Sequence, residues 1–308
     1  MNIDYTSPKP SENYIALPHF HPISMDAMAA YLTYFEHTPR RASDYTFANL
    51  WGWAEQYGMQ WRFEHGLCWL CQTVPTEFYW APVGPWHETD WLNIPLFKKG
   101  VSFVRVPDEL ITIWRDVFGD RLQVEESQGQ WDYLYTATDL AELKGNRFHR
   151  KKNHVNRFIK QYGLDYRPMT PDCIEDVLDM QQDWCLWREC AESESLLAEN
   201  EAVVRVLEEW DRIPNLIGGS LYINGKMAAY TVGEALDDET LVVHFEKGHG
   251  QYSGVYQAIN AEFIRHEGQP FQFVNREQDL GDEGLRHAKQ SYYPVGFVRK
   301  DRVTILGE

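Results

Sequence analysis

The chain has 308 residues, of which 44% are hydrophobic, and its formal net charge at pH 7 is −17. Its 12 Trp, 17 Tyr and 15 Phe can fill a large core, which excludes a disordered chain. No window approaches the ~18 uncharged apolar residues of a membrane helix, and the start MNIDYTSPKPSENY lacks the basic and apolar regions of a secretory signal. We expect a cytoplasmic protein without an integral membrane segment, and the acidity disfavours polyanionic partners unless a local basic patch offsets it.

The first half of the chain alternates helical and strand patterns. WRFEHGLCWLCQTV is typical of a hairpin that turns at His65-Gly66. In chain order, the patterns predict helices over 25–37 and 47–57, the hairpin over 61–74, a strand over 77–83, a strand and then a helix over 101–118, and two strands within 121–136.

The second half is more clearly patterned. GGSLYINGKMAAYTVGEA contains Asn224-Gly225, the strongest short hairpin signal. In chain order, we expect a helix over 144–163, a strand over 164–170, a helix from Pro171, a helix around Val203–Trp210, the hairpin over 218–235, a strand over 241–247, a helix over 255–266, a strand over 271–275, a helix from Asp282 and a last strand over 295–306.

The two halves share one order of elements: helices, hairpin, strand, connection, strand, helix and strand. This order predicts an α/β fold (α+β, with mixed sheets) made by duplication of one unit. We expect two tandem domains, 1–140 and 141–308, with the candidate site in the second. A single larger α/β domain is the alternative.

Five cysteines fit a reducing compartment. Cys68 and Cys71 have the spacing of half a metal site, but positions three apart in a strand point to opposite faces. Cys173, Cys185 and Cys190 include no matching pair with two-residue spacing. We therefore expect ordinary thiols and no metal.

Three blocks in the second half resemble the phosphatidylglycerol lysyltransferase C-terminal domain family: KGNRFHRKKNHVNRFIKQY, VHFEKGHGQYSGVYQAINAEFI and FVNREQDLGDEGLRHAKQSYYP. The resemblance implies two tandem acyltransferase folds of the Gcn5-related N-acetyltransferase type. In membrane-linked members of that family, the activity is transfer of an aminoacyl group from charged tRNA to a lipid headgroup. This sequence lacks their membrane segment, so the resemblance leaves the acceptor open.

Two polar residues in LVVHFEK are candidate catalytic groups. Alternation places His244 and Glu246 on one face of the expected strand. Acyl transfer to an amine needs a group that accepts the amine proton, and a carboxylate or imidazole can do so. Alternatively, both side chains are solvated, or Glu246 pairs with a nearby Lys or Arg.

KGHGQYSGVY resembles in part the loop that binds coenzyme A pyrophosphate in acetyltransferases. In that loop, backbone N–H groups at a helix start hold the phosphates. The candidate cofactor-binding residues here are Gln251, Tyr252, Ser253 and Gly254. Tyr256 replaces a small residue of that motif, and a glycine-rich turn that begins a helix is the alternative.

FVNREQDLGDEGLRHAKQSYYP places many charges between an expected strand and helix. Such positions are common active sites in α/β folds. Arg286 and Lys289 are candidates for binding a carboxylate or phosphate, and Glu277 or Asp279 for binding an ammonium group, with Asp279 also a catalytic candidate. The full substrate-binding set is Asn275, Arg276, Glu277, Arg286, Lys289 and Tyr292. The alternative is a structural network, with Asp282–Arg286 and Glu283–His287 as i,i+4 pairs.

The expected helix over 144–160 has seven Lys or Arg and no acid. Arg147, Arg150 and Lys151 are candidates for binding donor phosphates, either of tRNA or of coenzyme A. Packing against acidic surface of the first half is the alternative.

Together these features predict an acyl- or aminoacyl-transferase that acts on a small-molecule amine or hydroxyl acceptor by direct transfer. The donor is aminoacyl-tRNA or acyl-coenzyme A. No Cys or Ser is indicated as a covalent nucleophile. The alternative function is a binding module that senses a small anionic metabolite without turnover.

Overall fold

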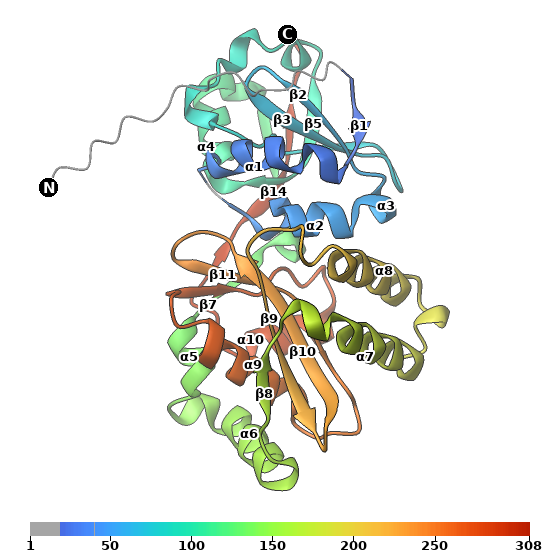
Figure 1. The fold of residues 1–308 in the computed structure, drawn as a ribbon. Helices are drawn as coiled ribbons and strands as arrows, with labels where there is room; N and C mark the ends of the chain where they lie inside the picture. Colours follow the sequence, from blue (N-terminus) through green and yellow to red (C-terminus); the bar gives the residue numbers. More distant parts are fainter. Residues whose placement is uncertain (1–18, 40) are drawn as a thin grey trace, which may run out of the picture.

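The computed structural model describes residues 19–39 and 41–308, which form two α/β units stacked end to end (Figure 1). Within these residues each unit contains a mixed sheet of seven strands. Across the first sheet the strands are β1 (His21–Pro22), β2 (Gln60–Glu64), β3 (Leu67–Gln72), β4 (Phe78–Trp80), β5 (Val101–Pro107), β14 (Lys300–Ile305) and β6 (Leu122–Glu125). Across the second they are β13 (Gly296–Val298), β7 (Asp132–Thr136), β12 (Phe273–Asn275), β11 (Thr240–Gly248), β10 (Lys226–Ala235), β9 (Leu216–Ile223) and β8 (Tyr166–Pro168).

Helices cover both faces of the second sheet. In the first unit the helices are α1 (Met28–Glu36), α2 (Phe47–Gly52), α3 (Ala54–Tyr57) and α4 (Asp108–Phe118). In the second they are α5 (Ala137–Glu142), α6 (His149–Tyr162), α7 (Ile174–Trp187), α8 (Glu194–Glu208), α9 (Val255–Glu267) and α10 (Glu283–Gln290). Helix α9 packs on β9, β10 and β11 and contacts α5 and α6, whereas α7 packs on β10 and β11 and contacts α8. Glu246 contacts α9 and the next residue, Lys247, contacts α8, so the two helix layers lie on opposite faces (Figure 1).

Both predicted hairpins are confirmed. His65 and Gly66 connect β2 and β3, and Asn224 and Gly225 connect β9 and β10, all four with positive φ as the tight turns require. Each sheet also contains one parallel pair, β4 with β5 and β11 with β12, while its other strand pairs are antiparallel. The repeated arrangement agrees with the predicted duplication of one mixed α/β unit.

The two units exchange one strand each. β7, from the end of the first half, lies between β12 and β13 in the second sheet, and β14, at the C-terminal end, lies between β5 and β6 in the first. The single last strand predicted over 295–306 is therefore wrong, because β13 and β14 belong to different sheets. The sheets depart from the predicted 1–140 and 141–308 division at β7 and β14, and the domain boundary itself stays a prediction.

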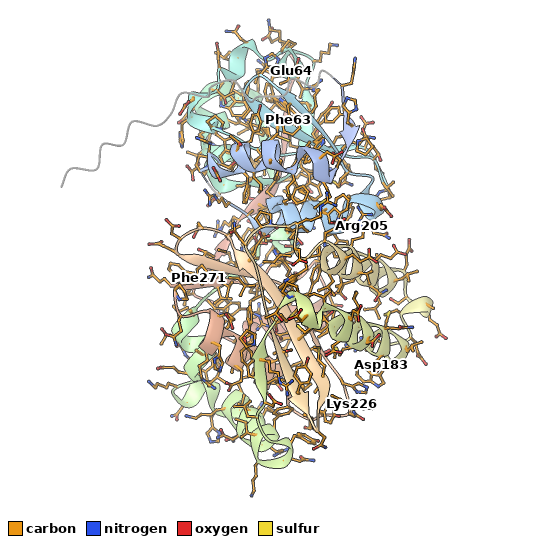
Figure 2. All side chains as sticks on the ribbon, in the orientation of Figure 1. Phe63, Glu64, Asp183, Arg205, Lys226 and Phe271 are labelled. Carbon is orange, nitrogen blue, oxygen red and sulfur yellow. A yellow bond between two sulfur atoms is a disulfide. The ribbon has the colours of Figure 1, made fainter. Side chains whose placement is uncertain are left out.

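The cores of the two units are continuous. One apolar cluster extends from the aromatic core of the first unit to residues of α7, α8, β10 and β11. At this boundary a Cβ on Gly52 of α2 would lie 3.1 Å from the carbonyl oxygen of Ala202 on α8, so the glycine allows the two helices to meet closely. Arg205 lies over the Trp51 ring there (Figure 2). The contact between the units is thus part of the folded core.

Candidate functional site

Strands β11 and β12 form a fork. They pair from Thr240–Phe273 to Val242–Asn275, where β12 ends while β11 continues to Gly248. Beyond that point two ion pairs join β11 to the loop after β12: His244 with Glu277 at 2.8 Å, and Glu246 with Arg276 at 3.2 Å. The structure therefore brings together the two sequence blocks that carry the candidate residues.

The buried imidazole of His244 is held between two carboxylates. Its Nε2 lies 2.8 Å from Glu234 and its Nδ1 lies 2.8 Å from Glu277. Burial opposes protonation of His244, but the hydrogen bonds to Glu234 and Glu277 outweigh it and raise its pKa to about 9. At neutral pH both ring nitrogens therefore donate, and His244 has no lone pair with which to accept a substrate proton. One oxygen of Glu277, Oε1, is likewise engaged, since it also accepts a hydrogen bond from Asn49 of the first unit.

Asn275 belongs to a buried ionic network between the two units. Lys300 lies between Asp44 and Asp132, and Arg105 pairs with Asp44. Asn275 donates to the second oxygen of Asp132 at 3.0 Å. We call these five residues the inter-unit network, and its contacts give Asn275 a structural role in place of the predicted substrate contact.

Asp279 and Arg286 form an ion pair. Arg286 donates two hydrogen bonds to the Asp279 carboxylate, at 2.7 and 3.1 Å, and Tyr133 donates a third at 2.7 Å. Burial of Asp279 works against ionisation, but the bonds from Arg286 and Tyr133 prevail and lower its pKa. Both oxygens of Asp279 are occupied, so its predicted use as a catalytic or ammonium-binding group finds no free atom, whereas Arg286 uses only Nε and Nη2 here and its role as an anion-binding group stays a prediction. The alternative i,i+4 partner of Arg286, Asp282, instead caps α10 by accepting a bond from the Leu285 amide.

The remaining candidates converge at the open end of the fork. Arg276 lies 5.0 Å and Lys151 4.0 Å from the centre of the Tyr292 ring. Lys289 donates to the carbonyl oxygens of Arg276 and Glu277. We call Lys151, Glu246, Arg276, Lys289 and Tyr292 the fork cluster. Its ion pair is partly accessible, with side-chain exposures of 11% for Glu246 and 16% for Arg276.

Two lysines of the fork cluster have no acidic partner. Among the described residues, no carboxylate lies within ion-pair distance of Lys151 or Lys289. Burial lowers the pKa of Lys289 to about 8, and the nearby Arg276 charge lowers it as well. Burial and Arg276 also lower the pKa of Lys151, although Glu246 works in the opposite direction. The charges of Glu277, Asp132 and Asp279 act on Lys289 in the opposite direction, so what both lysines lack in the described chain is a direct ion pair.

Two buried polar atoms beside Glu246 were missed by the sequence analysis. Asn260 of α9 donates from Nδ2 to Glu246 at 3.1 Å, and Thr231 of β10 is the cross-strand partner of Glu246. Asn260 Oδ1 and Thr231 Oγ1 have no hydrogen-bond partner among the described residues. We call these two atoms and the Glu246 carboxylate the polar niche. The sequence carries no signal for them, because β10 and α9 each contain several polar residues and the tertiary fold decides which of these are buried.

The loop that was predicted to bind coenzyme A lies against α6. Gly254 has φ 87°, and a Cβ on it would lie 2.7 Å from the carbonyl oxygen of His154. Tyr252 packs on Tyr162 with ring centres 5.2 Å apart, while Gln251 and Ser253 are exposed. The close backbone approach that the glycine permits is therefore used by α6.

The basic helix α6 presents polar side chains on two sides. Lys151 points to the fork cluster, while Arg150, Asn153, His154 and Arg157 line a separate hollow of about 390 Å³. Arg147, just before α6, pairs with Asp139 at 2.7 Å. Of the three predicted donor-binding cations, Arg150 lines the outer hollow, Lys151 joins the site, and Arg147 is paired within the second unit.

The profile of the family Phosphatidylglycerol lysyltransferase, C-terminal, matches residues 35–300. The chain belongs to this family. A crystal structure of a conserved protein of unknown function from Bacteroides thetaiotaomicron is 31% identical, with a TM-score of 0.83, over 93% of this chain and 99% of that one. FemX has a similar fold, with a TM-score of 0.61 at 7% identity over 94% of this chain and 97% of that one.

The family match extends into the first unit, for which the sequence showed only a shared order of elements. An uncharacterized protein of Mycoplasmoides gallisepticum is 23% identical over 177 residues, which are 57% of this chain and 56% of that protein. The match thus spans about half the length of that relative. The predicted fold class, α/β with two tandem units of the acyltransferase type, is confirmed by the two mixed sheets and by these similarities. No helix within residues 19–39 and 41–308 is long and apolar enough to cross a membrane.

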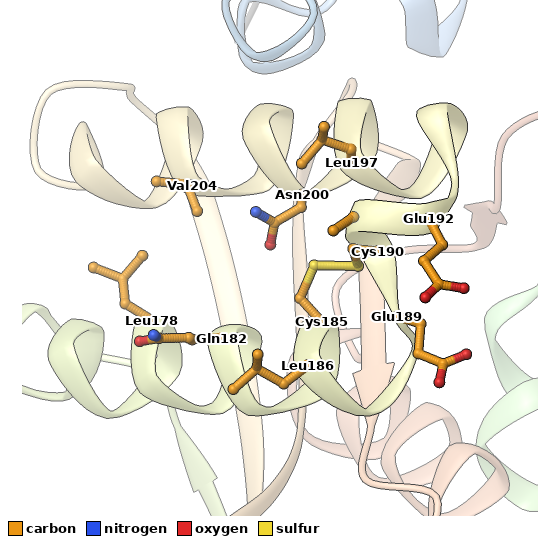
Figure 3. Close-up of a pocket in the computed structure, with 11 residues that line it drawn as sticks. Leu178, Gln182, Cys185, Leu186, Glu189, Cys190, Glu192, Leu197, Asn200 and Val204 are labelled. Atoms are coloured by element: carbon orange, nitrogen blue, oxygen red, sulfur yellow. A yellow bond between two sulfur atoms is a disulfide. The ribbon is translucent and has the colours of Figure 1, made fainter.

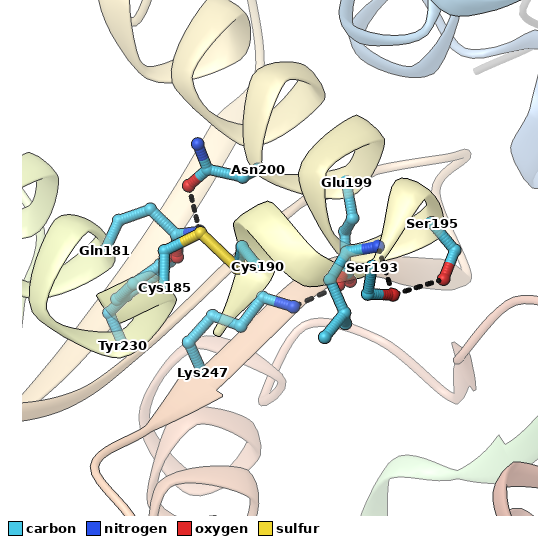
Figure 4. Close-up of a disulfide and its surroundings, with 10 residues drawn as sticks. Gln181, Cys185, Cys190, Ser193, Ser195, Glu199, Asn200, Tyr230 and Lys247 are labelled. Atoms are coloured by element: carbon cyan, nitrogen blue, oxygen red, sulfur yellow. Dashed lines mark hydrogen bonds and ion pairs between the residues drawn. A yellow bond between two sulfur atoms is a disulfide. The ribbon is translucent and has the colours of Figure 1, made fainter. Parts of the chain in front are cut away.

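This family member also has a hollow of about 620 Å³ between α7 and α8 (Figure 3). Its wall includes a disulfide between Cys185 and Cys190, which corrects the prediction of free thiols at these positions (Figure 4). The two-residue spacing that is typical of metal-binding cysteines does not indicate this pair, whose members are five positions apart. Cys68, Cys71 and Cys173 are free.

Proposed function

We propose that the chain is an acyl- or aminoacyl-transferase whose reaction takes place at the fork cluster. The observation that carries this proposal is the convergence of Glu246, Arg276, Lys151 and Lys289 where two parallel strands separate. Ligands of α/β folds commonly bind at the carboxyl ends of strands. The membership in a lysyltransferase family supports the same class of reaction.

In this proposal Glu246 accepts the proton of the acceptor. The acceptor nitrogen or oxygen attacks the carbonyl carbon of the donor, and the bond from that carbon to the donor oxygen, or to sulfur in a thioester, breaks. The acceptor proton passes to Glu246, and the protonated Glu246 gives it to the leaving oxygen or sulfur, which restores the carboxylate. Arg276 and Asn260 hold the Glu246 carboxylate from two sides, at 3.2 and 3.1 Å, which fixes its direction.

Aminoacyl-tRNA is the donor that the geometry favours. The outer face of α6 presents Arg150 and Arg157 around a hollow, and such cations bind a nucleic-acid backbone. The backbone at Gly254, which an acetyltransferase would use for a pyrophosphate, is covered by α6. Because charged tRNA is made in the cytoplasm, the proposal also places the reaction there.

A binding module for a small anionic metabolite is the second candidate. It is favoured by Lys151 and Lys289, which would hold an anion whether or not any transfer followed. In that case Glu246 would only position Arg276.

The test supplies the purified protein with a mixture of aminoacyl-tRNAs or with acyl-coenzyme A, together with candidate acceptors, and follows products by mass spectrometry. We expect a product with aminoacyl-tRNA, and Glu246→Gln should lower its rate by about 10²-fold or more, because general-base catalysis contributes about that much. The control is Glu283→Gln, which makes the same change from carboxylate to amide at an exposed position of α10 and should leave the rate unchanged. Absence of any product, with stabilisation by an anionic metabolite, would instead establish the binding module.

A further inference from the structure

The polar niche is an unsatisfied hydrogen-bonding site next to the proposed proton acceptor. Thr231 and Asn260 are 0% and 1% exposed, and each has a polar oxygen without a partner in the described chain. Buried polar atoms in folded proteins nearly always have partners, because an unpaired one costs free energy. Both oxygens accept hydrogen bonds, and the third member of the niche is a carboxylate. The niche therefore suits a ligand that brings N–H donors, as an amine or ammonium does.

The fork cluster presents the opposite requirement a short distance away. Lys151 of α6 and Arg276 lie over the same ring, that of Tyr292. Lys289 of α10 donates to the carbonyl oxygen of Arg276, whose side chain pairs with Glu246. Neither lysine has an acidic partner in the described chain, and burial raises the cost of leaving such charges unmatched. Cations arranged in this way suit a carboxylate or phosphate.

We propose that the acceptor is a zwitterion, with an amine in the polar niche and a carboxylate or phosphate on Lys151 and Lys289. Free amino acids and aminoalkyl phosphates have this chemistry. The identification rests on the proposed function, since it treats the bound amine as the attacking group. An acceptor with only an acidic group would leave the niche unsatisfied, and one with only an amine would leave both lysines unmatched.

Binding without any donor tests the inference directly. Isothermal titration uses each of the twenty free amino acids, O-phosphoethanolamine, and two analogues of the tightest binder. One analogue is N-acetylated and lacks the amine, and the other is its amide and lacks the acid. We expect saturable binding of at least one zwitterion, and at least 10-fold weaker binding of both analogues, because hydrogen bonds to charged groups contribute that much.

Matched variants assign each half of the ligand to its residues. Lys151→Gln should remove the preference for the acid over the amide, while Lys160→Gln, an exposed position on the same helix, should change nothing. Thr231→Val should remove the preference for the free amine over the acetylated form, while Thr231→Ser, which retains the hydroxyl, should keep it. Circular dichroism verifies that each variant is folded, and the serine variant provides the comparison if valine disturbs β10.

A further arm asks whether the zwitterion belongs to a lipid. Co-sedimentation with vesicles of phosphatidylethanolamine and phosphatidylcholine, but not with phosphatidylcholine alone, would place the same chemistry on a headgroup. The inference is overturned if the amide or the acetylated analogue binds as tightly as the parent compound, or if no zwitterion saturates the protein in either arm. Zwitterion binding with no product under any donor would remove the transferase, and with it the role of acceptor, but would leave the zwitterion site itself intact. Transfer to acceptors without an acidic group would support the transferase and overturn the inference that the acceptor is a zwitterion.

Discussion

The inter-unit network lies between the two units and the fork cluster lies within the second, and these two groups of charged residues differ in how their charges are paired. In the inter-unit network two carboxylates, Asp44 and Asp132, meet two cations, Arg105 and Lys300. Burial alone would lower the pKa of Lys300, but Asp132 and Asp44 outweigh it and raise that pKa. In the fork cluster only Arg276 has an acidic partner, and burial lowers the pKa of Lys289.

This difference distinguishes charges that are paired within the fold from charges whose partner a ligand would supply. A buried charge with a partner for every hydrogen-bonding group stabilises one arrangement of the chain, and removing one partner is costly. A buried charge without such a partner lowers stability until something binds to it, which is typical of functional sites. The two groups can therefore be distinguished by how stability and binding respond to single substitutions.

The largest expected effect is on the inter-unit network. Lys300→Met should lower the free energy of unfolding by about 3–5 kcal/mol, because it leaves Asp44 and Asp132 buried without their shared cation. Urea denaturation followed by fluorescence measures the change. Lys226→Met, at the exposed end of β10, is the control and should stay within about 0.5 kcal/mol. A loss below about 1 kcal/mol for Lys300→Met would show that the network is not what holds the units together.

Much of the fold could be predicted because its signals are local. The turns at His65-Gly66 and Asn224-Gly225, and the cap of α10 by Asp282, depend only on neighbouring residues, and all are present. The exchange of β7 and β14 could not be predicted, because these strands pair with partners more than a hundred residues away and their own patterns do not specify which sheet they join.

The charge-rich segments singled out in the sequence include Glu246, Arg276 and Lys289, and the structure brings these three residues together, while their roles stay a prediction. The sequence could not show that His244 and Asp279 bond to Glu234, Glu277, Arg286 and Tyr133, because those partners come from four separate segments. Only tertiary contacts distinguish charges that have a direct ion pair from charges that do not.

The pH dependence of stability should reveal the matched imidazolium. The folded pKa of His244, about 9, lies above its ordinary value of 6.5, so its contribution is fully present below about pH 6.5 and is lost as the pH rises through 9. Between pH 6 and pH 8 the free energy of unfolding should fall by about 2 kcal/mol. His244→Gln should reduce this slope in urea titrations at several pH values. An unchanged slope in the variant would show that His244 is not protonated in the folded protein.

Reduction of the Cys185–Cys190 disulfide tests whether stability can change while the inter-unit network and the fork cluster stay intact. The bridge closes a short loop at the end of α7, so a thiol reductant should lower the free energy of unfolding by about 2 kcal/mol (Figure 4). Binding of zwitterionic probes should not change, because the sulfurs lie on the opposite side of the second sheet from Glu246. The double variant Cys185→Ser with Cys190→Ser is the control and should not respond to the reductant. Equal stability with and without reductant in the native chain would mean that the bridge is absent in solution.

Lys289→Met should have the smallest effect on stability, and it is the most direct test of the difference between the fork cluster and the inter-unit network. The variant loses the hydrogen bonds to the carbonyls of Arg276 and Glu277, but it also removes a charge that burial disfavours below about pH 8. These effects oppose each other, so the free energy of unfolding at pH 7 should change by less than about 1 kcal/mol. Binding of the zwitterionic probe should nevertheless weaken at least 10-fold, as titration would show. If Lys289→Met were instead as destabilising as Lys300→Met with binding unchanged, the fork cluster would be a second structural network, and the distinction between matched and unmatched charges would fail.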